Sequence, residues 1–224
     1  NLVIAPGEKI AIVGPTGSGK STLIRLLTRS YDFPDQSIFL DDIDLNHIRS
    51  SDVRRRVGVV LQDFHIFAGS VLDNIQLGNP NITREDAIKA ARWVQAHDFI
   101  QGLPEGYDTT LHERGQNLSQ GQRQLLSFAR VLASDPEILV LDEATASIDT
   151  ETEQKIQTAL KQLTKGRTAI LIAHRLQTIQ EADRIVVLKQ GEIREVGTHA
   201  ELMRLQGLYY TLTQLQFQDV SRSP

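Results

Sequence analysis

The chain has 224 residues, with 24 Lys and Arg against 28 Asp and Glu, and a net charge of −4. This balance argues against an electrostatic nucleic-acid surface, for which a basic domain is expected, so we expect no nucleic acid as a partner. The chain has no cysteine, which excludes disulfides and thiol chemistry, and no apolar stretch reaches the ~18 to 20 residues of a membrane helix. The length and composition suit one soluble globular unit, with room for two lobes.

The first expected elements are a strand followed by a helix. Residues 9–13 (KIAIV) form a short apolar run, and Leu23, Leu26 and Leu27 recur at helical spacing within residues 20–30. Between them, residues 14–21 match the phosphate-loop pattern G-x-x-x-x-G-K-[ST]. Its glycines let backbone N–H groups wrap a phosphate at a helix N-terminus. The predicted nucleotide site consists of Gly14, Pro15, Thr16, Gly17, Ser18, Gly19, Lys20, Ser21 and Thr22.

Two side chains of this loop have separate predicted roles. We expect Lys20 to contact the β- and γ-phosphates. We expect Ser21 to ligate Mg²⁺, a hard cation that prefers oxygen. The alternative is a glycine-rich turn that only precedes a helix, which the complete motif between strand and helix argues against.

Three later apolar runs each end at residues suited to phosphate chemistry. Residues 57–61 precede Gln62, residues 138–141 precede Asp142 and Glu143, and residues 169–173 precede His174. Continuous apolar runs are typical of strands buried on both faces of a parallel sheet. Ligands of such sheets bind beyond the carboxyl ends of the strands. One edge is therefore expected to collect these polar side chains beside the phosphate loop.

The chemistry of these side chains suggests their roles. Adjacent strand residues point to opposite sides, so Asp142 and Glu143 cannot have the same role. By similarity to other P-loop NTPases, Asp142 is assigned to Mg²⁺ and Glu143 to the attacking water as general base. Gln62 suits a γ-phosphate sensor that bonds both a metal-bound water and the nucleophile, and His174 is expected to donate to the γ-phosphate. The histidines expected at the surface or as caps are His47, His65, His97, His112 and His199.

Residues 63–134 are expected to be largely helical. Thr83 and Asp86 resemble a helix cap, and residues 118–122 (LSQGQ) begin an amphipathic helix. Ser119 and Gln122 fit a capping box that only closes the helix end. Alternatively, Ser119, the Gly121 backbone and the helix dipole form a second anion site. The two interpretations are compatible.

The complete pattern predicts an α/β fold of the P-loop NTPase type. A mostly parallel sheet core is expected with an antiparallel part and an inserted helical subdomain, residues 1–62 and 135–224 forming the core and residues 63–134 the insertion. A strand pair is expected in residues 37–45, a hairpin in residues 184–196 around Gln190–Gly191, and a cap at Thr198 and Glu201. The aromatic residues predicted to pack within helices are Trp93, Tyr209 and Tyr210.

With these motifs in order, the chain resembles the nucleotide-binding domain of an ATP-binding cassette (ABC) transporter. Residues 14–21 correspond to Walker A, Gln62 to the Q-loop, residues 118–122 to the signature, residues 138–142 to Walker B, residues 147–149 to the D-loop and His174 to the switch histidine. The resemblance implies ATP and Mg²⁺ as cofactors and adds Gln122 and Asp149 to the nucleotide site. It also implies a second nucleotide-binding domain, identical or different, paired head to tail so that Ser119 faces ATP held by Lys20 of the other domain.

Two segments resemble exporters within this family. Residues 112–116 (HERGQ) are similar to the exporter X-loop, and residues 63–67 resemble the surface that receives coupling helices. We therefore expect a transmembrane domain to contact the segments Phe64 to Phe67 and Glu113 to Gly115, and the domain to lie at the cytoplasmic face of a membrane. A solvated structural loop is the alternative for each segment.

The chain departs from the family pattern at two places. Gln120 replaces the usual middle glycine of the signature, and the adenine-stacking aromatic upstream of Walker A is missing from a chain that starts at Asn1. We expect a segment of a longer polypeptide, with a membrane domain upstream. A chromosome-maintenance or break-repair cassette would need a long coiled coil between Walker A and the signature. A degenerate cassette that binds ATP without hydrolysis is disfavoured by the intact Glu143 and His174.

Overall fold

The computed structural model describes residues 1–61, 65–142, 150–173 and 176–220. It divides into two compact units. The first comprises Asn1–Val57, Ile138–Thr145 and Thr168–Pro224, and the second comprises Gly58–Glu137 and Ala146–Arg167. The functional division predicted at residues 62 and 135 stays a prediction.

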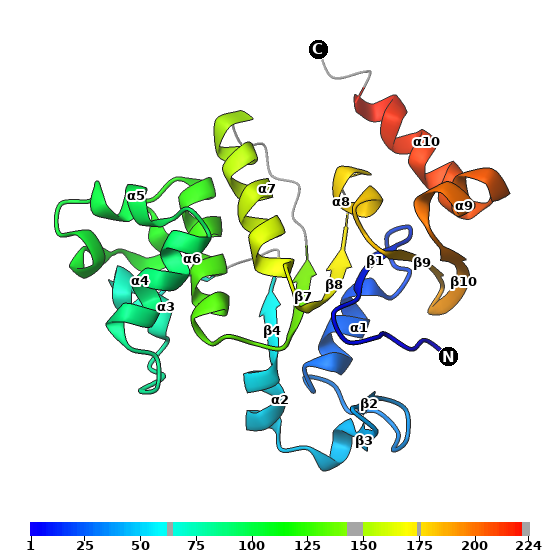
Figure 1. The fold of residues 1–224 in the computed structure, drawn as a ribbon, viewed down its shortest axis with the longest axis horizontal. Helices are drawn as coiled ribbons and strands as arrows, with labels where there is room; N and C mark the ends of the chain where they lie inside the picture. Colours follow the sequence, from blue (N-terminus) through cyan, green and yellow to red (C-terminus); the bar gives the residue numbers. More distant parts are fainter. Residues whose placement is uncertain (62–64, 143–149, 174–175, 221–224) are drawn as a thin grey trace. The chain divides into compact units, whose positions relative to one another are not determined.

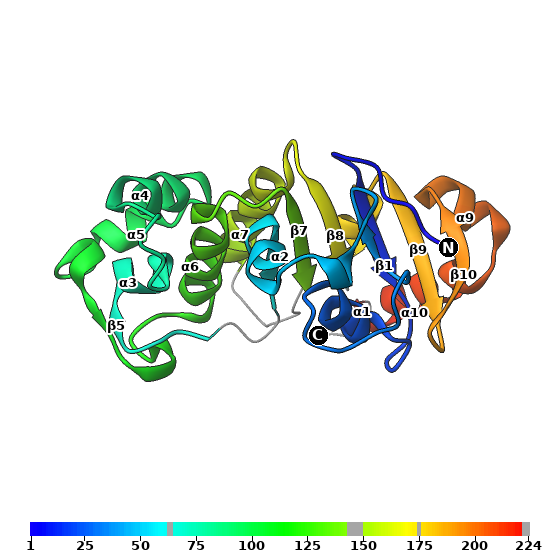
Figure 2. The same cartoon turned by 90° about the horizontal axis from the view of Figure 1, so that it is seen from below.

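The first unit is built around a mostly parallel sheet. Strand β1 (Lys9–Val13) lies between β8 (Thr168–Ile172) and β9 (Arg184–Lys189), and β7 (Ile138–Asp142) follows β8. These pairs are parallel, whereas β10 (Glu192–Gly197) runs antiparallel to β9. Figure 2 shows the order β10-β9-β1-β8-β7. The predicted mostly parallel core with an antiparallel part is confirmed, as is the hairpin around Gln190.

The apolar runs of the sequence form the interior of this sheet. Ile10, Ala11, Leu139 and Val140 are completely buried, as expected for strands covered on both faces. Ile172 of β8 is the register partner of both Ile12 on β1 and Asp142 on β7. The carboxyl ends of these three strands therefore meet at one edge, where the phosphate loop begins.

The remaining elements of the first unit are short. They are α1 (Lys20–Leu27), β2 (Phe39–Leu40), β3 (Ile43–Asp44), η1 (Leu45–His47), α2 (Ser50–Arg56), α8 (Leu176–Gln180), α9 (His199–Leu205) and α10 (Leu208–Val220) (Figure 1). The strand pair expected in residues 37–45 is present as β2 and β3, paired over two residues each. The predicted cap of α9 is present as a capping box between Thr198 and Glu201.

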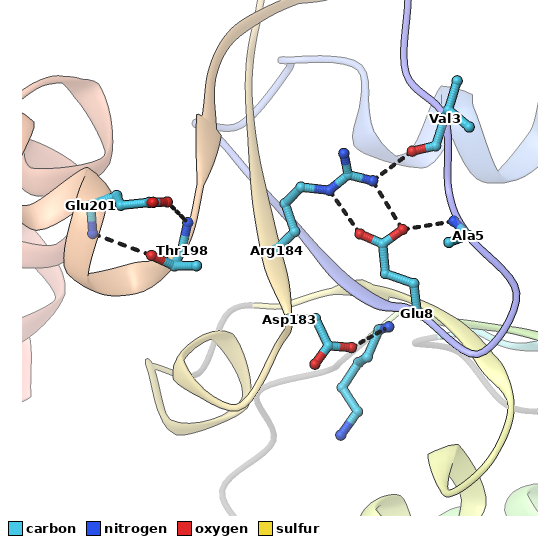
Figure 3. Close-up of polar contacts among 8 residues, drawn as sticks. Val3, Ala5, Glu8, Asp183, Arg184, Thr198 and Glu201 are labelled. Atoms are coloured by element: carbon cyan, nitrogen blue, oxygen red, sulfur yellow. Dashed lines mark hydrogen bonds and ion pairs between the residues drawn. The ribbon is translucent and has the colours of Figure 1, made fainter.

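The N-terminal segment is tied to β9 by charged side chains (Figure 3). The Arg184 guanidinium pairs with Glu8, with 2.8 Å between Nε and Oε1, and also donates to the Val3 carbonyl oxygen at 2.5 Å. The other Glu8 oxygen accepts from the Ala5 N–H at 2.7 Å, and Asp183 accepts from the Lys9 N–H at 2.8 Å. These bonds fix the entry into β1.

The second unit is largely helical in its described part, as predicted. It contains α3 (Val71–Gln76), α4 (Arg84–Trp93), α5 (His97–Gln101), α6 (Gln120–Ala133) and α7 (Thr150–Thr164), with η2 (Gly106–Asp108) and η3 (Glu113–Gly115). Strand β4 (Val57–Val60) leads into it, and β5 (Gly69–Ser70) pairs antiparallel with β6 (Thr110–Leu111). The pair β5 and β6 has no counterpart among the sequence expectations.

Side-chain packing agrees with the sequence at Tyr209 but not at Trp93. Tyr209 is buried and its hydroxyl lies 2.7 Å from His199 Nδ1. Trp93, at the end of α4, keeps 46% of its surface exposed. Trp93 was predicted to pack within a helix, and the structure leaves it packed only in part.

Candidate functional site

The phosphate loop joins β1 to α1 as predicted. Gly19 precedes the helix with φ of 106°, a backbone conformation that favours glycine. A Cβ on Gly14 would lie 2.2 Å from the Leu188 carbonyl oxygen, so no larger residue fits there. Helix α1 has no side-chain cap and no acidic residue in its first turn. Its N-terminal N–H groups are therefore presented without a competing carboxylate, which suits an anion.

Lys20 turns its ammonium group back onto this loop. The side chain is buried, and Nζ donates to the Gly14 carbonyl at 2.7 Å and the Pro15 carbonyl at 3.1 Å, and lies 3.5 Å from Ser18 Oγ. Burial lowers the pKa of Lys20, while the charge of Asp142 acts to raise it. A bound phosphate can take the place of these neutral acceptors and give the cation a charged partner.

Among the described residues that were predicted to follow the strands, Asp142 is the one that the sheet brings to this edge. It is the last residue of β7 and is half-buried. Ser21, at the start of α1, is exposed, as is Thr22 next to it. A hydroxyl and a carboxylate are the oxygen ligands that Mg²⁺ prefers, so Ser21 and Asp142 fit the predicted role. No cluster of three His, Asp or Glu side chains in the described residues could hold a metal. Phosphate and water oxygens would have to complete the coordination.

Four predicted site residues lie outside the described residues. These are Gln62, Glu143, Asp149 and His174. Their predicted roles stay predictions.

The signature segment begins helix α6 through a capping box. Ser119 Oγ accepts from the Gln122 N–H at 3.2 Å, and Gln122 Oε1 accepts from the Ser119 N–H at 2.9 Å. The Ser119 hydroxyl hydrogen remains available as a donor, so the predicted cap does not exclude a phosphate contact. Gly121 is buried, whereas Gln120 is exposed. The side chain of Gln120, which replaces the usual glycine of the family, therefore lies in solvent.

The two segments predicted to receive a membrane domain contact each other within the second unit. The Arg114 N–H donates to the Ile66 carbonyl at 3.1 Å. A Cβ on Gly115 would lie 3.1 Å from Ile66, which is completely buried. Phe67, next along the chain, keeps 48% of its surface exposed. The exposed residues of the two segments, His65, Phe67, Glu113 and Arg114, therefore lie on backbone that is joined around buried Ile66, and residues 65–67 and 113–115 are hereafter called the docking surface. Phe64, also predicted there, lies outside the described residues.

Arg130 connects the docking surface to helix α6. Its guanidinium donates to the His65 carbonyl and the Asn74 carbonyl, both at 2.8 Å, and lies 5.7 Å from the Phe67 ring centre. Buried Asn74 bonds both backbone polar groups of Phe67 at 2.9 Å. Burial lowers the pKa of Arg130 to about 10. Sequence analysis did not single out Arg130, since neither His65 nor Asn74 is near it in the chain.

Comparisons with known proteins agree with this geometry. The family model described as "ABC transporter" matches residues 1–146. A Bacillus subtilis protein called an uncharacterized ABC transporter ATP-binding protein is 50% identical over 96% of the chain and 35% of its own length. An ATP-dependent lipid A-core flippase from Syntrophus aciditrophicus is 48% identical over 98% of the chain and 36% of its own length. The chain thus spans about a third of the length of these curated relatives.

A solved structure gives the same result. A bacterial Atm1-family ABC exporter with ATP bound superposes with a TM-score of 0.87 at 43% identity, covering 95% of this chain and 37% of the exporter. No described helix of this chain is both long and apolar enough to cross a membrane.

Proposed function

The chain belongs to the ABC transporter family as an ATPase domain of the exporter type, and from this premise we propose that it binds Mg-ATP at the phosphate loop and hydrolyses it to drive export. The observation that carries the proposal is the open N-terminus of α1, with Lys20 lying over the loop under the influence of the Asp142 charge. Lys20 contacts the phosphates, while Ser21 and Asp142 hold Mg²⁺, which neutralises phosphate charge. Glu143 accepts the proton of the attacking water, and Gln62 and His174 position it.

We propose that the active form is a head-to-tail pair of such domains enclosing two Mg-ATP. Ser119, Gly121 and Gln122 of one domain then face ATP bound at Lys20 of the other, and Asp149 lines the same site. Supporting this, Ser119 keeps a free donor hydrogen at a helix N-terminus, where an anion is favoured.

We also propose that the docking surface receives a transmembrane domain, which places this domain at the cytoplasmic face of a membrane. Support comes from the direct contact between residues 66 and 114, from the exposed ring of Phe67, and from the similarity to a lipid A-core flippase and to a solved ABC exporter. An alternative is a non-hydrolysing cassette of an asymmetric transporter. It would bind ATP through the same phosphate loop, so turnover distinguishes the two.

Complementation of two inactive variants tests the composite site. Lys20→Ala and Ser119→Arg homodimers each lack two working sites, whereas a mixed dimer contains one intact site. Mixing the purified variants should therefore restore ATP hydrolysis. Activity no greater than the mean of the separate variants, despite demonstrated subunit exchange, would favour a site complete within one chain.

Replacement of the proposed general base tests hydrolysis itself. Glu143→Gln should keep ATP binding and lose ~10²-fold or more of the turnover, the low end of a general-base contribution. The variant should then accumulate an ATP-bound dimer, visible by size-exclusion chromatography. Unchanged turnover in Glu143→Gln would remove this residue from the mechanism.

A further inference from the structure

The turn between β9 and β10 contacts the phosphate loop through the backbone. Gln190 and Gly191 have φ of 54° and 78°, as in tight hairpin turns with both central residues left-handed. The Gly191 N–H donates to the Ser18 carbonyl oxygen at 2.9 Å. A Cβ on Gly19 would lie 3.6 Å from Gly191 Cα, so the two backbones approach closely. A residue far from the loop in sequence thus holds one of its peptides.

This bond determines which way the next N–H group points. A trans peptide is planar, so the carbonyl of Ser18 and the N–H of Gly19 point in opposite directions. Because Gly191 holds the Ser18 carbonyl on the hairpin side, the Gly19 N–H is directed away from the hairpin. Gly19 is the residue immediately before helix α1, where N–H groups are presented to an anion.

The hairpin bond differs from the other bonds that hold the loop. Lys20 bonds the Gly14 and Pro15 carbonyls, and it must give these up when its ammonium turns to a phosphate. The Gly191 N–H comes from outside the loop and uses a carbonyl that a phosphate cannot bond. This bond can therefore persist in both the free and the nucleotide-bound loop.

We propose that Gly191 is a positioning residue for nucleotide binding: its N–H orients the Ser18–Gly19 peptide so that the Gly19 N–H is presented to the phosphate. The inference rests on the proposed function, since it assumes that the loop binds a nucleotide. The close approach of the Leu188 carbonyl to Gly14 adds a second point at which β9 shapes the same loop.

The chain offers a matched control at the opposite end of β1. Gly7 has the same φ as Gly191, 78°, and is also exposed, and no heavy atom lies within 4 Å of a Cβ at either position. The Gly7 N–H also makes one hydrogen bond, to Thr168 Oγ1 at 2.9 Å. Gly7→Pro and Gly191→Pro therefore each remove one bond and meet the same conflict in φ, but only the second touches the phosphate loop.

The test is the affinity of the 224-residue chain for Mg-ADP by titration calorimetry, with urea unfolding as a control for stability. Both variants should lose similar stability, and only Gly191→Pro should weaken Mg-ADP binding, by about tenfold or more. If Gly191→Pro does not fold, the pair Gly7→Ala and Gly191→Ala repeats the comparison with the milder strain of a Cβ at positive φ.

The outcomes separate the two proposals. Equal Mg-ADP affinity in the folded Gly7 and Gly191 variants would overturn the positioning role of Gly191. Absence of Mg-ADP binding by the unaltered chain would instead refute the proposed function.

Discussion

Helices α1 and α6 both begin at a proposed phosphate site, yet their first turns are built differently. The start of α1 has no side-chain cap, and Lys20 donates to carbonyl groups of the loop. The start of α6 is closed by Ser119 and Gln122, which bond each other's backbone. An uncapped helix start leaves its first N–H groups to an anion, whereas the capping box of α6 already occupies the N–H groups of Ser119 and Gln122. The difference fits a primary site at Lys20 and a secondary one at Ser119.

The capping box of α6 also differs from the other boxes of the described chain. The boxes of α3, α4 and α9 use the carboxylates Asp73, Asp86 and Glu201 at the third helical position. The box of α6 uses the neutral amide of Gln122. A carboxylate there would repel a phosphate, so the helix is closed without adding a negative charge.

The largest expected effect concerns the open helix start. Lys20→Met should weaken nucleotide binding roughly 10- to 100-fold, since a hydrogen bond to a charged group contributes about 1.5–3 kcal/mol. Calorimetric titration with Mg-ADP measures the change. Lys165→Met removes the same charge at an exposed position of the second unit and should leave the affinity unchanged. Equal losses in both variants would show that the effect is not local to the loop.

Changing the charge at the third helical position of two capping boxes tests the capped start of α6. Gln122→Glu keeps a capping box but places a carboxylate beside the proposed phosphate, at a cost of roughly 1 to 4 kcal/mol. ATP turnover should fall about tenfold or more, with unchanged unfolding in urea. The reverse exchange, Asp86→Gln in α4, should leave turnover unaltered. Full activity of Gln122→Glu would mean that no phosphate approaches this turn.

Removal of the capping hydroxyl separates stability from function. Ser119→Ala and Thr83→Ala should each lower the free energy of unfolding by about 1 kcal/mol, the usual cost of losing a cap. Only Ser119→Ala should also reduce ATP turnover, while monomer binding of Mg-ADP stays normal. A loss of turnover in Thr83→Ala as large as in Ser119→Ala would reduce Ser119 to a structural role.

The smallest expected effect is on the pH dependence of stability, through the capping boxes that contain a carboxylate. Hydrogen bonds from Thr83 hold the pKa of Asp86 below its usual value, and bonds from Ser70 and Thr198 do the same for Asp73 and Glu201. A carboxylate with a lowered folded pKa stabilises the fold above its unfolded pKa, and this stability is lost as pH falls through the folded pKa. Urea unfolding between about pH 5 and pH 3 should therefore show less pH dependence for Asp86→Gln than for the unaltered chain.

Much of the fold could be predicted because its signals are local. The strand and helix on either side of the phosphate loop, the apolar strands and the caps at Thr83, Ser119 and Thr198 are each contained in a few consecutive residues, and each is confirmed. The two-residue pair β5 and β6 was missed because Gly69 and Leu111 lie far apart in the chain and form no periodic pattern.

The part of the candidate site that could be predicted is the part placed by the ends of parallel strands. Asp142 reaches the edge beside Lys20 because parallel strands end together. The bonds from Gly191 to Ser18 and from Arg130 to His65 depend on how separate elements pack, which residue type and spacing do not encode.

The ion pair of Glu8 and Arg184, with the bond from Arg184 to the Val3 carbonyl, also affects how the domain responds to force at its N-terminal end. A pull on the chain at residue 1 reaches the Arg184 bond to the Val3 carbonyl before it reaches the sheet. Behind it, β1 is bonded on both sides to the parallel strands β8 and β9. Tension along the strand axis would load these bonds together rather than one after another, so we expect this end of the domain to extend little under load.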